Sequence, residues 1–232
     1  MTLQIIPELL SRLPGRFATE LGLDLKAGPA ERQKWFLAAI LYGARISGKL
    51  AARTYQVFAA RGIYTPEAIL EQGWDNLVVL LDTGGYARYD FKTATKLLTV
   101  MASLKEQYQG SLERLHAVAA HCPDLEKRLQ DLAPGIGPAT ANIFLRELRG
   151  VWAKATPPLI PLAQLAGVHL GLIPPGLTPE AALAALEREW RRQPPGIHDF
   201  ADLEAALVRL GRDYCRKPQG SPCPMGIYCG RK

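Results

Sequence analysis

Cysteine is scarce in this sequence, and long apolar runs are absent. The 232 residues include only 4 cysteines, too few for the dense disulfide framework of a small secreted protein. No run of about 18 apolar residues indicates a transmembrane helix. The N-terminus lacks the basic, apolar and small-residue pattern of a secretory signal. We therefore expect a cytoplasmic protein that makes no contact with a membrane.

Strand patterns are missing as well. Helical periodicity recurs along the chain, with glycine and proline at the breaks. No segment shows the alternation of apolar and polar residues that is typical of a strand. The sequence therefore predicts an all-α fold. The expected helices cover 3–13, 30–46, 48–61, 66–72, 75–83, 90–108, 111–120, 123–132, 138–149, 162–171, 178–192 and 199–214.

The charge balance is moderately basic. The chain has 28 Lys and Arg against 22 Asp and Glu, which gives a net charge of +6. A basic face that binds nucleic acid is consistent with this balance. Many solvated protein surfaces have a similar charge, so the net charge alone does not show that the protein binds nucleic acid. The sequence motifs are more informative.

The most informative segment is 129–143, which reads as a helix, a tight turn and a second helix. The first helix must end before Pro134, because proline disfavours helical geometry in the residue ahead of it. Gly135 and Gly137 suit a tight turn, and Pro138 suits the first turn of the next helix. Bare amides at a helix N-terminus favour an anion such as phosphate. The alternative is an ordinary hairpin whose glycines only cap a helix.

This segment resembles the helix-hairpin-helix of the endonuclease III superfamily of DNA glycosylases, whose hairpin reads Leu-Pro-Gly-Val-Gly-x-Lys-Thr-Ala. The matching positions are Gly135, Ile136, Gly137, Thr140 and Ala141. Ala139 stands where the bifunctional members hold their Schiff-base lysine. The resemblance implies a monomer that binds double-stranded DNA, damaged or modified, in association with the nucleoid.

The resemblance also implies two helical domains. The first is a helical barrel over 30–152 that contains the helix-hairpin-helix at about 123–149. The second combines 1–29 with 153–232 and carries a Cys-rich, iron-sulfur-type loop at 215–229. A run of prolines from Pro157 to Pro161 marks the crossing between them.

Further DNA contacts are expected outside the hairpin. Arg45 takes the place of the glutamine with which the family fills the gap left by a flipped base. Its guanidinium has the donors for that role, but a solvated basic residue at the start of a helix with Lys49 and Arg53 is an equal alternative. The expected DNA-binding residues are Gly135, Ile136, Gly137, Ala139, Thr140, Arg45 and Lys49.

The C-terminal cysteines resemble the ligands of the family's iron-sulfur loop. Their spacing is Cys215-x7-Cys223-x5-Cys229, and the family's second cysteine has no counterpart. Thiolates favour iron, so we expect a [4Fe-4S] cluster with an incomplete cysteine set, its fourth iron bound by water or Ser221. A [3Fe-4S] cluster, zinc or no metal are the alternatives. Cys122 is expected to be a buried thiol.

The family's catalytic aspartate is also missing. Its place lies in the segment 155–165, which contains no carboxylate, and Pro161 stands near the position itself. The candidate substitutes are Lys154, Asp90 and Glu147. Each has a non-catalytic alternative: a phosphate contact for Lys154, a helix N-cap for Asp90, and an ion pair on a solvated helix face for Glu147.

Three functions are compatible with these features. The first is a DNA N-glycosylase that flips a damaged or modified base and uses non-standard catalytic residues, monofunctional rather than bifunctional. The second is a non-catalytic module that binds lesions or distorted DNA. The third is an iron-sulfur redox or cluster-handling protein. The hairpin favours the first two.

Overall fold

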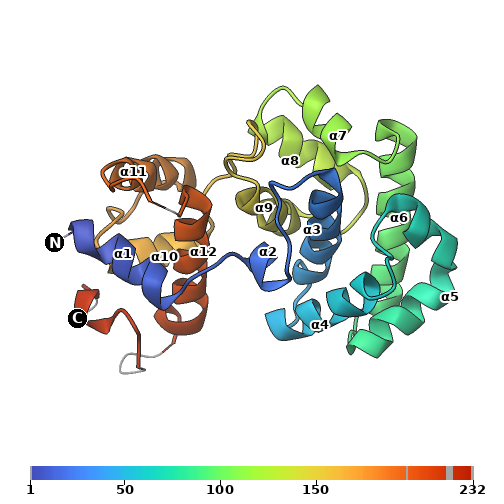
Figure 1. Ribbon diagram of the computed structural model, residues 1–232, viewed down its shortest axis with the longest axis horizontal. Helices are drawn as coiled ribbons and strands as arrows, with labels where there is room; N and C mark the ends of the chain where they lie inside the picture. The colour runs from blue at the N-terminus through green and yellow to red at the C-terminus, as the bar shows by residue number, and fades with distance from the viewer. Residues whose placement is uncertain (1, 197, 218–221, 231–232) are drawn as a thin grey trace. The chain divides into compact units, whose positions relative to one another are not determined.

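The computed structural model describes residues 2–196, 198–217 and 222–230, and these residues form helices and connections without a strand (Figure 1). The all-α prediction is confirmed. The α-helices are α1 (Thr2–Arg12), α2 (Phe17–Glu20), α3 (Pro29–Tyr42), α4 (Gly48–Ala59), α5 (Pro66–Gly84), α6 (Asp90–Tyr108), α7 (Leu112–Val118), α8 (Cys122–Asp131), α9 (Pro138–Glu147), α10 (Pro161–His169), α11 (Pro179–Arg191) and α12 (Phe200–Leu210). A π-helical turn, η1 (Gly211–Cys215), and a 3₁₀ turn, η2 (Gly226–Tyr228), follow.

Local sequence accounts for most of the helix starts. Ser47, Thr65 and Thr178 cap α4, α5 and α11, each accepting a hydrogen bond from an amide in the first turn. Asp199 and Asp202 form a reciprocal capping box at α12. None of the helices in the described ranges is long and apolar enough to cross a membrane.

The chain divides into two compact units, 21–157 and 1–20 with 158–232. We expected the boundaries near 30 and 152, and the difference has local causes. Arg32 donates to the carbonyl of Leu25 at 2.7 Å, which ties the segment before α3 to the first unit. Ala155 is fully buried, and Arg149 donates to the carbonyl of Pro157, so the segment after α9 stays with the same unit.

The unit 21–157 is built around α3. This helix packs against α4, α7 and α9, while α5 and α6 pack against each other (Figure 1). Trp35 is fully buried and donates from Nε1 to the carbonyl of Phe144 at 3.1 Å, which fixes α3 against α9. Tyr86 Oη donates to the carbonyl of Leu41 at 2.9 Å and fixes the α5–α6 connection to the end of α3.

The other unit has α10 and α12 at its centre, with α1 against α12 and α11 against α10. A Cβ at Gly211 would overlap the carbonyl of Leu162, so glycine allows η1 to approach α10 closely. Arg209 donates to Glu20 at 2.7 Å and joins the N-terminal segment to α12. These contacts combine the two ends of the chain in one unit.

Two helices differ from the predictions where glycine intervenes. The segments 66–72 and 75–83 form the single element α5, which is kinked at Gly73 with φ +66°. Helix α3 ends at Tyr42, whereas we expected it to reach residue 46. Gly43 to Ser47 therefore form a connection rather than a helical turn.

Candidate nucleic-acid interface

The turn between α8 and α9 has the geometry that its glycines predict. The amide of Ile136 donates to the carbonyl of Ala133 at 3.1 Å, which closes a four-residue turn. Gly135 occupies its third position with φ +89°, and Pro134 precedes it. Proline at the second position and glycine at a third position with positive φ are typical of a type II turn.

Several backbone amides in this turn and in the first turn of α9 are available to bind an anion. Within the described residues, no acceptor is found for the amides of Gly135, Gly137, Ala139 and Thr140. Gly137 is the N-cap of α9, and Pro138 follows at N1, where its missing N–H is not needed. A helix N-terminus with free amides favours a phosphate group.

The residues of the hairpin are of two kinds, buried and exposed. Ile136 and Thr140 are each only 3% exposed, so these two residues can reach a ligand only through their backbone. Gly135 and Ala139 are exposed. A Cβ at Gly43 would overlap the Thr140 hydroxyl, so the α3–α4 connection lies directly against the start of α9.

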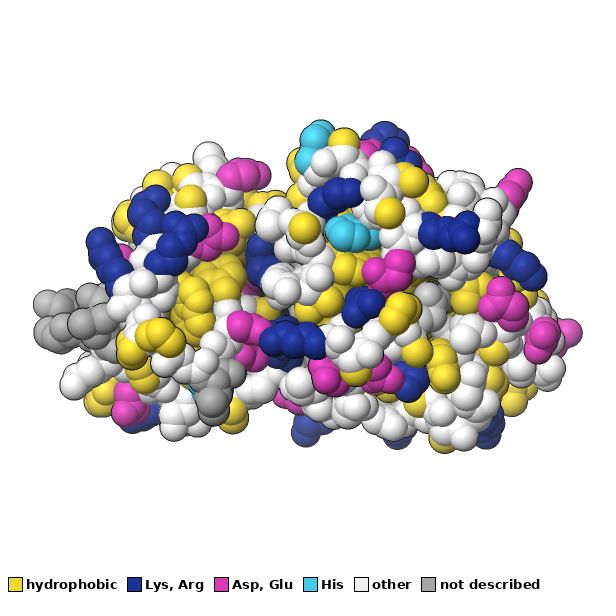
Figure 2. Space-filling model, turned by 45° about the horizontal axis from the view of Figure 1, so that its top comes forward, with side chains coloured by type: hydrophobic (Ala, Val, Ile, Leu, Met, Phe, Trp, Pro, Cys, Tyr) yellow, Lys and Arg dark blue, Asp and Glu magenta, His cyan; other side chains and the backbone are white. Residues whose placement is uncertain are grey.

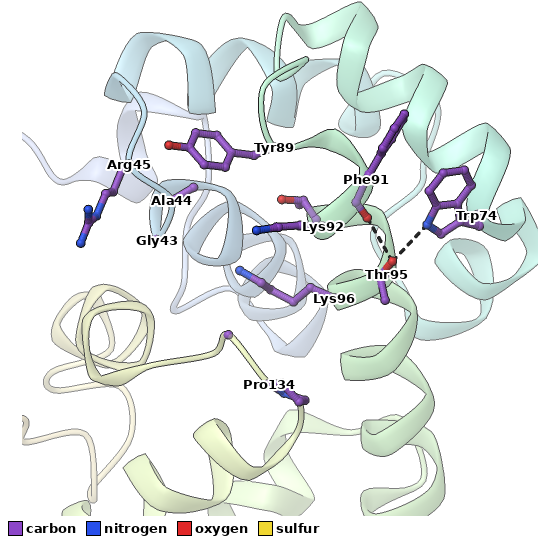
Figure 3. Close-up of a pocket in the computed structure, with 12 residues that line it drawn as sticks. Gly43, Ala44, Arg45, Trp74, Tyr89, Phe91, Lys92, Thr95, Lys96 and Pro134 are labelled. Atoms are coloured by element: carbon purple, nitrogen blue, oxygen red, sulfur yellow. Dashed lines mark hydrogen bonds between the residues drawn. The ribbon is translucent and has the colours of Figure 1, made fainter.

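A pocket of about 640 Å³ opens beside the hairpin (Figure 3). It lies within the unit 21–157 and brings together the α3–α4 connection, α5, α6 and the turn before α9. Its lining residues are Gly43, Ala44, Arg45, Trp74, Tyr89, Phe91, Lys92, Thr93, Thr95, Lys96, Pro134 and Gly135. The turn glycine is therefore part of the pocket wall.

The charged side chains that line this pocket are all basic: Arg45, Lys92 and Lys96. A Cβ at Gly135 would lie 3.0 Å from Lys96 Cε, which shows how closely this lysine approaches the hairpin. Burial lowers the pKa of Lys96. By contrast, Figure 2 shows basic and acidic side chains interspersed on the face that it draws. The net charge alone would not locate this concentration of cations.

Arg45 and Lys49 are both exposed, on different elements. Arg45 lies in the α3–α4 connection rather than at the start of a helix with Lys49 and Arg53, but it is exposed, as the alternative of a solvated basic residue requires. Its side chain points away from Lys92 and Lys96 in Figure 3. Lys49 lies in the first turn of α4, whereas Arg53 donates to the carbonyl of Gly84 at 2.7 Å. Their DNA contacts stay a prediction.

The candidate catalytic residues do not gather at this pocket. Lys154 Nζ donates to the carbonyls of His116 at 2.8 Å and Ala117 at 2.9 Å, so it holds the end of α7. Glu147 is 1% exposed, which corrects its assignment to a solvated helix face. Asp90 accepts from the amide of Phe91 at 2.7 Å, and the N-cap of α6 is Tyr89 rather than Asp90.

Pro161, near the expected place of the family's aspartate, is the first residue of α10. Its side chain supplies no general base there. The contacts made by Lys154 and Asp90 are of a kind that stabilises helices, and Glu147 is buried. They lend no support to a nucleophile or a base at any of these three positions.

Among the described residues, the three C-terminal cysteines form no disulfide and are of intermediate exposure. In the ranges that the structure describes, no group of three His, Cys, Asp or Glu side chains gathers to hold a metal ion. The described residues therefore lend no support to the predicted cluster, which stays a prediction, and Ser221 lies outside them. Cys122 is 8% exposed, and burial raises its pKa, which confirms the predicted buried thiol.

Sequence reasoning missed the aromatic and basic lining of the pocket. The prolines and glycines indicated the hairpin, but Trp74, Phe91, Lys92 and Lys96 form no motif in the sequence. Lys92 and Lys96 are four residues apart and so share one side of a helix. That spacing was the feature of the sequence from which a basic side of this helix could have been predicted.

Comparison with known proteins supports the same architecture. No family model matches the sequence, and no curated protein matches it significantly. A solved structure of a trapped endonuclease III-DNA covalent intermediate, an estranged-adenine complex, is 18% identical with a TM-score of 0.55, over 99% of this chain and 96% of that one. A non-covalent endonuclease III-DNA complex is also 18% identical, with a TM-score of 0.57, over 99% of this chain and 95% of that one. The chain therefore has the all-α, helix-hairpin-helix fold of endonuclease III.

Proposed function

We propose that this chain binds double-stranded DNA and acts in base excision as a monofunctional DNA N-glycosylase, in the cytoplasm and associated with the nucleoid. The observation that carries the proposal is the turn at Gly135–Gly137. Its free amides lie beside a pocket whose charged lining residues are all basic. Both structural neighbours were solved with DNA. Phosphate contacts of this kind position a protein on DNA without reading its sequence.

Binding to a blunt duplex at increasing salt tests the DNA-binding part. We expect the logarithm of the association constant to fall linearly with the logarithm of salt concentration, with a slope of about −0.9 for each phosphate neutralised. Fluorescence anisotropy with duplexes of unrelated sequence measures this slope. An affinity that does not change with salt would contradict a phosphate interface.

Single-turnover incubation with duplexes that each carry one damaged or deaminated base tests the catalytic part. Ala139 stands in place of the Schiff-base lysine, so we expect base release without strand cleavage. Hot alkali should then cut the product at the abasic site, while untreated samples stay intact. Strand cleavage without alkali would contradict monofunctional chemistry.

A non-catalytic lesion-binding module is the second candidate, and the absence of a carboxylate in 155–165 favours it. The two candidates differ in one result. Tight, salt-sensitive binding with no product from any duplex would establish the module and exclude the glycosylase.

The iron-sulfur cluster is a separate prediction. If the tail binds a cluster, protein purified without oxygen should be brown and should lose its visible absorbance on Cys215→Ala substitution. Cys122→Ala is the matched control, because this thiol is buried at the start of α8. A colourless anaerobic preparation would remove the cluster from the proposal.

A further inference from the structure

We propose that the pocket beside the hairpin binds one unpaired nucleotide of bound DNA, with its base on the Trp74–Phe91 ring pair and its phosphate on Lys92 and Lys96. This inference rests on the proposed DNA binding. It adds that the protein also recognises a single-stranded segment next to the duplex. The volume of about 640 Å³ lies within the roughly 300–1,000 Å³ of small-molecule sites.

The ring pair is exposed although both of its members are large and apolar. Trp74 is 39% exposed and Phe91 is 59% exposed, whereas Trp35 and Trp152 are buried. The ring centroids of Trp74 and Phe91 lie 5.2 Å apart at an interplanar angle of 45°. The two rings therefore contact each other, while a large part of their surface stays available to a base.

Hydrogen bonds hold the tryptophan in place. Trp74 Nε1 donates to Thr95 Oγ1 at 3.0 Å, and the same hydroxyl donates to the carbonyl of Phe91 at 3.0 Å (Figure 3). The kink at Gly73, with φ +66°, lies immediately before this tryptophan. An exposed aromatic ring held in one orientation loses little conformational entropy when it stacks on a base.

The two lysines provide a complementary charge. Lys92 and Lys96 are four residues apart on α6, and no hydrogen-bond acceptor or ion-pair partner is found for either among the described residues. Figure 3 shows both side chains directed toward Gly43 and Ala44. Like charges at this spacing repel each other, and partial burial of Lys96 increases that penalty. A phosphate between them would relieve it.

The occupant must be unpaired because of its stacking requirement. In a continuous duplex both faces of each base are covered by neighbouring base pairs, so a protein ring can stack only on a base that has left the stack. Gly135 belongs to both the hairpin and the pocket. One DNA molecule can therefore place duplex phosphates on the hairpin and an adjacent unpaired nucleotide in the pocket.

The test compares a blunt duplex with the same duplex carrying a single-stranded oligothymidine tail, by fluorescence anisotropy. We expect the tail to increase affinity by about 5-fold or more, the effect typical of stacking one base. Trp74→Leu and Phe91→Leu should each remove this gain while changing blunt-duplex affinity by less than about 2-fold. Val79→Ala is the matched control, because Val79 is a 62% exposed apolar residue of α5 outside the pocket.

The lysines give an independent measurement. The double substitution Lys92→Gln and Lys96→Gln should reduce the salt dependence of the tail-dependent gain, by about 0.7 in the slope for each single-strand phosphate lost. Thermal melting verifies that each variant is folded.

The outcomes separate this inference from the proposed function. A wild-type protein that binds the blunt duplex but gains nothing from the tail, or a Trp74→Leu variant that keeps the full gain, would overturn the inference and leave the function intact. Failure to bind the blunt duplex would overturn the proposed function itself. Equal weakening on both DNAs by Trp74→Leu would show a general DNA contact and would also overturn the inference.

Discussion

Replacing Gly137 by aspartate should weaken binding to duplex DNA by about 10- to 100-fold without unfolding the protein. Gly137 is the N-cap of α9, with φ −100° and ψ −179°, and a Cβ added at this position would meet no atom within 4 Å. This extended backbone accepts any residue, and aspartate is among the best N-caps. Its carboxylate would accept from the amides of Ala139 or Thr140, which are the groups proposed to bind phosphate.

The size of the effect follows from the bonds that are lost. A hydrogen bond to a charged group contributes roughly 1.5–3 kcal/mol, and a factor of ten in affinity corresponds to about 1.4 kcal/mol. Repulsion between the new carboxylate and the DNA adds to this loss. The thermal midpoint should stay the same or rise, because the N-cap is improved.

Two controls make this result specific. Gly196→Asp adds the same charge at an exposed glycine in the other unit, where a Cβ also meets no atom within 4 Å, and it should leave affinity nearly unchanged. Gly137→Ala adds a side chain without a charge or an acceptor and should have a small effect. Wild-type affinity in Gly137→Asp would exclude the hairpin as a phosphate site.

The hairpin could be predicted from sequence because its determinants are local. Pro134 stops one helix, Gly135 allows a positive φ, and Pro138 starts the next helix, each through a backbone preference of its own. The structure shows all three features. The all-α fold followed from periodicity for the same reason.

The remainder of the site depends on contacts between residues far apart in sequence. Glu147 lies on α9 next to Arg146, a sequence that suggests a solvated face, yet both residues are buried. Trp74 lies in the wall of the pocket, 39% exposed and beside Phe91, which is 17 residues further along the chain, and no local pattern pairs these two rings. Burial is decided by which helices pack together, and that information is absent from a local pattern.

The end of α3 illustrates the same limit. Its helical pattern continues beyond Tyr42, but Gly43 must lie against Thr140 at the start of α9. This contact joins two segments nearly a hundred residues apart. It places the α3–α4 connection, including Arg45, at the pocket.

A double-mutant cycle at this contact should show strong coupling. Gly43→Ala would force its Cβ into the Thr140 hydroxyl and within 3.1 Å of Thr140 Cβ, and overpacking of this kind costs about 1–3 kcal/mol of unfolding free energy. Thr140→Ala removes a buried methyl and hydroxyl and should cost about 1 kcal/mol. Together the two changes should cost less than their sum, by about 0.5 kcal/mol or more.

Urea unfolding of the wild type, the two single variants and the double variant measures this coupling. In the double variant the hydroxyl overlap is removed, but the two Cβ atoms still lie 3.1 Å apart, so the relief should be partial. Gly196→Ala is the control for adding a methyl group, because Gly196 has free space around it. Strict additivity would mean that Gly43 and Thr140 do not touch.

The coupling matters for function because the same contact holds the free amides of α9 beside the basic pocket. A hairpin released from α3 would keep its local turn geometry but lose its fixed position relative to Lys92 and Lys96. The Gly43→Ala variant should therefore bind tailed duplex more weakly, and Thr140→Ala should restore part of that binding together with the stability.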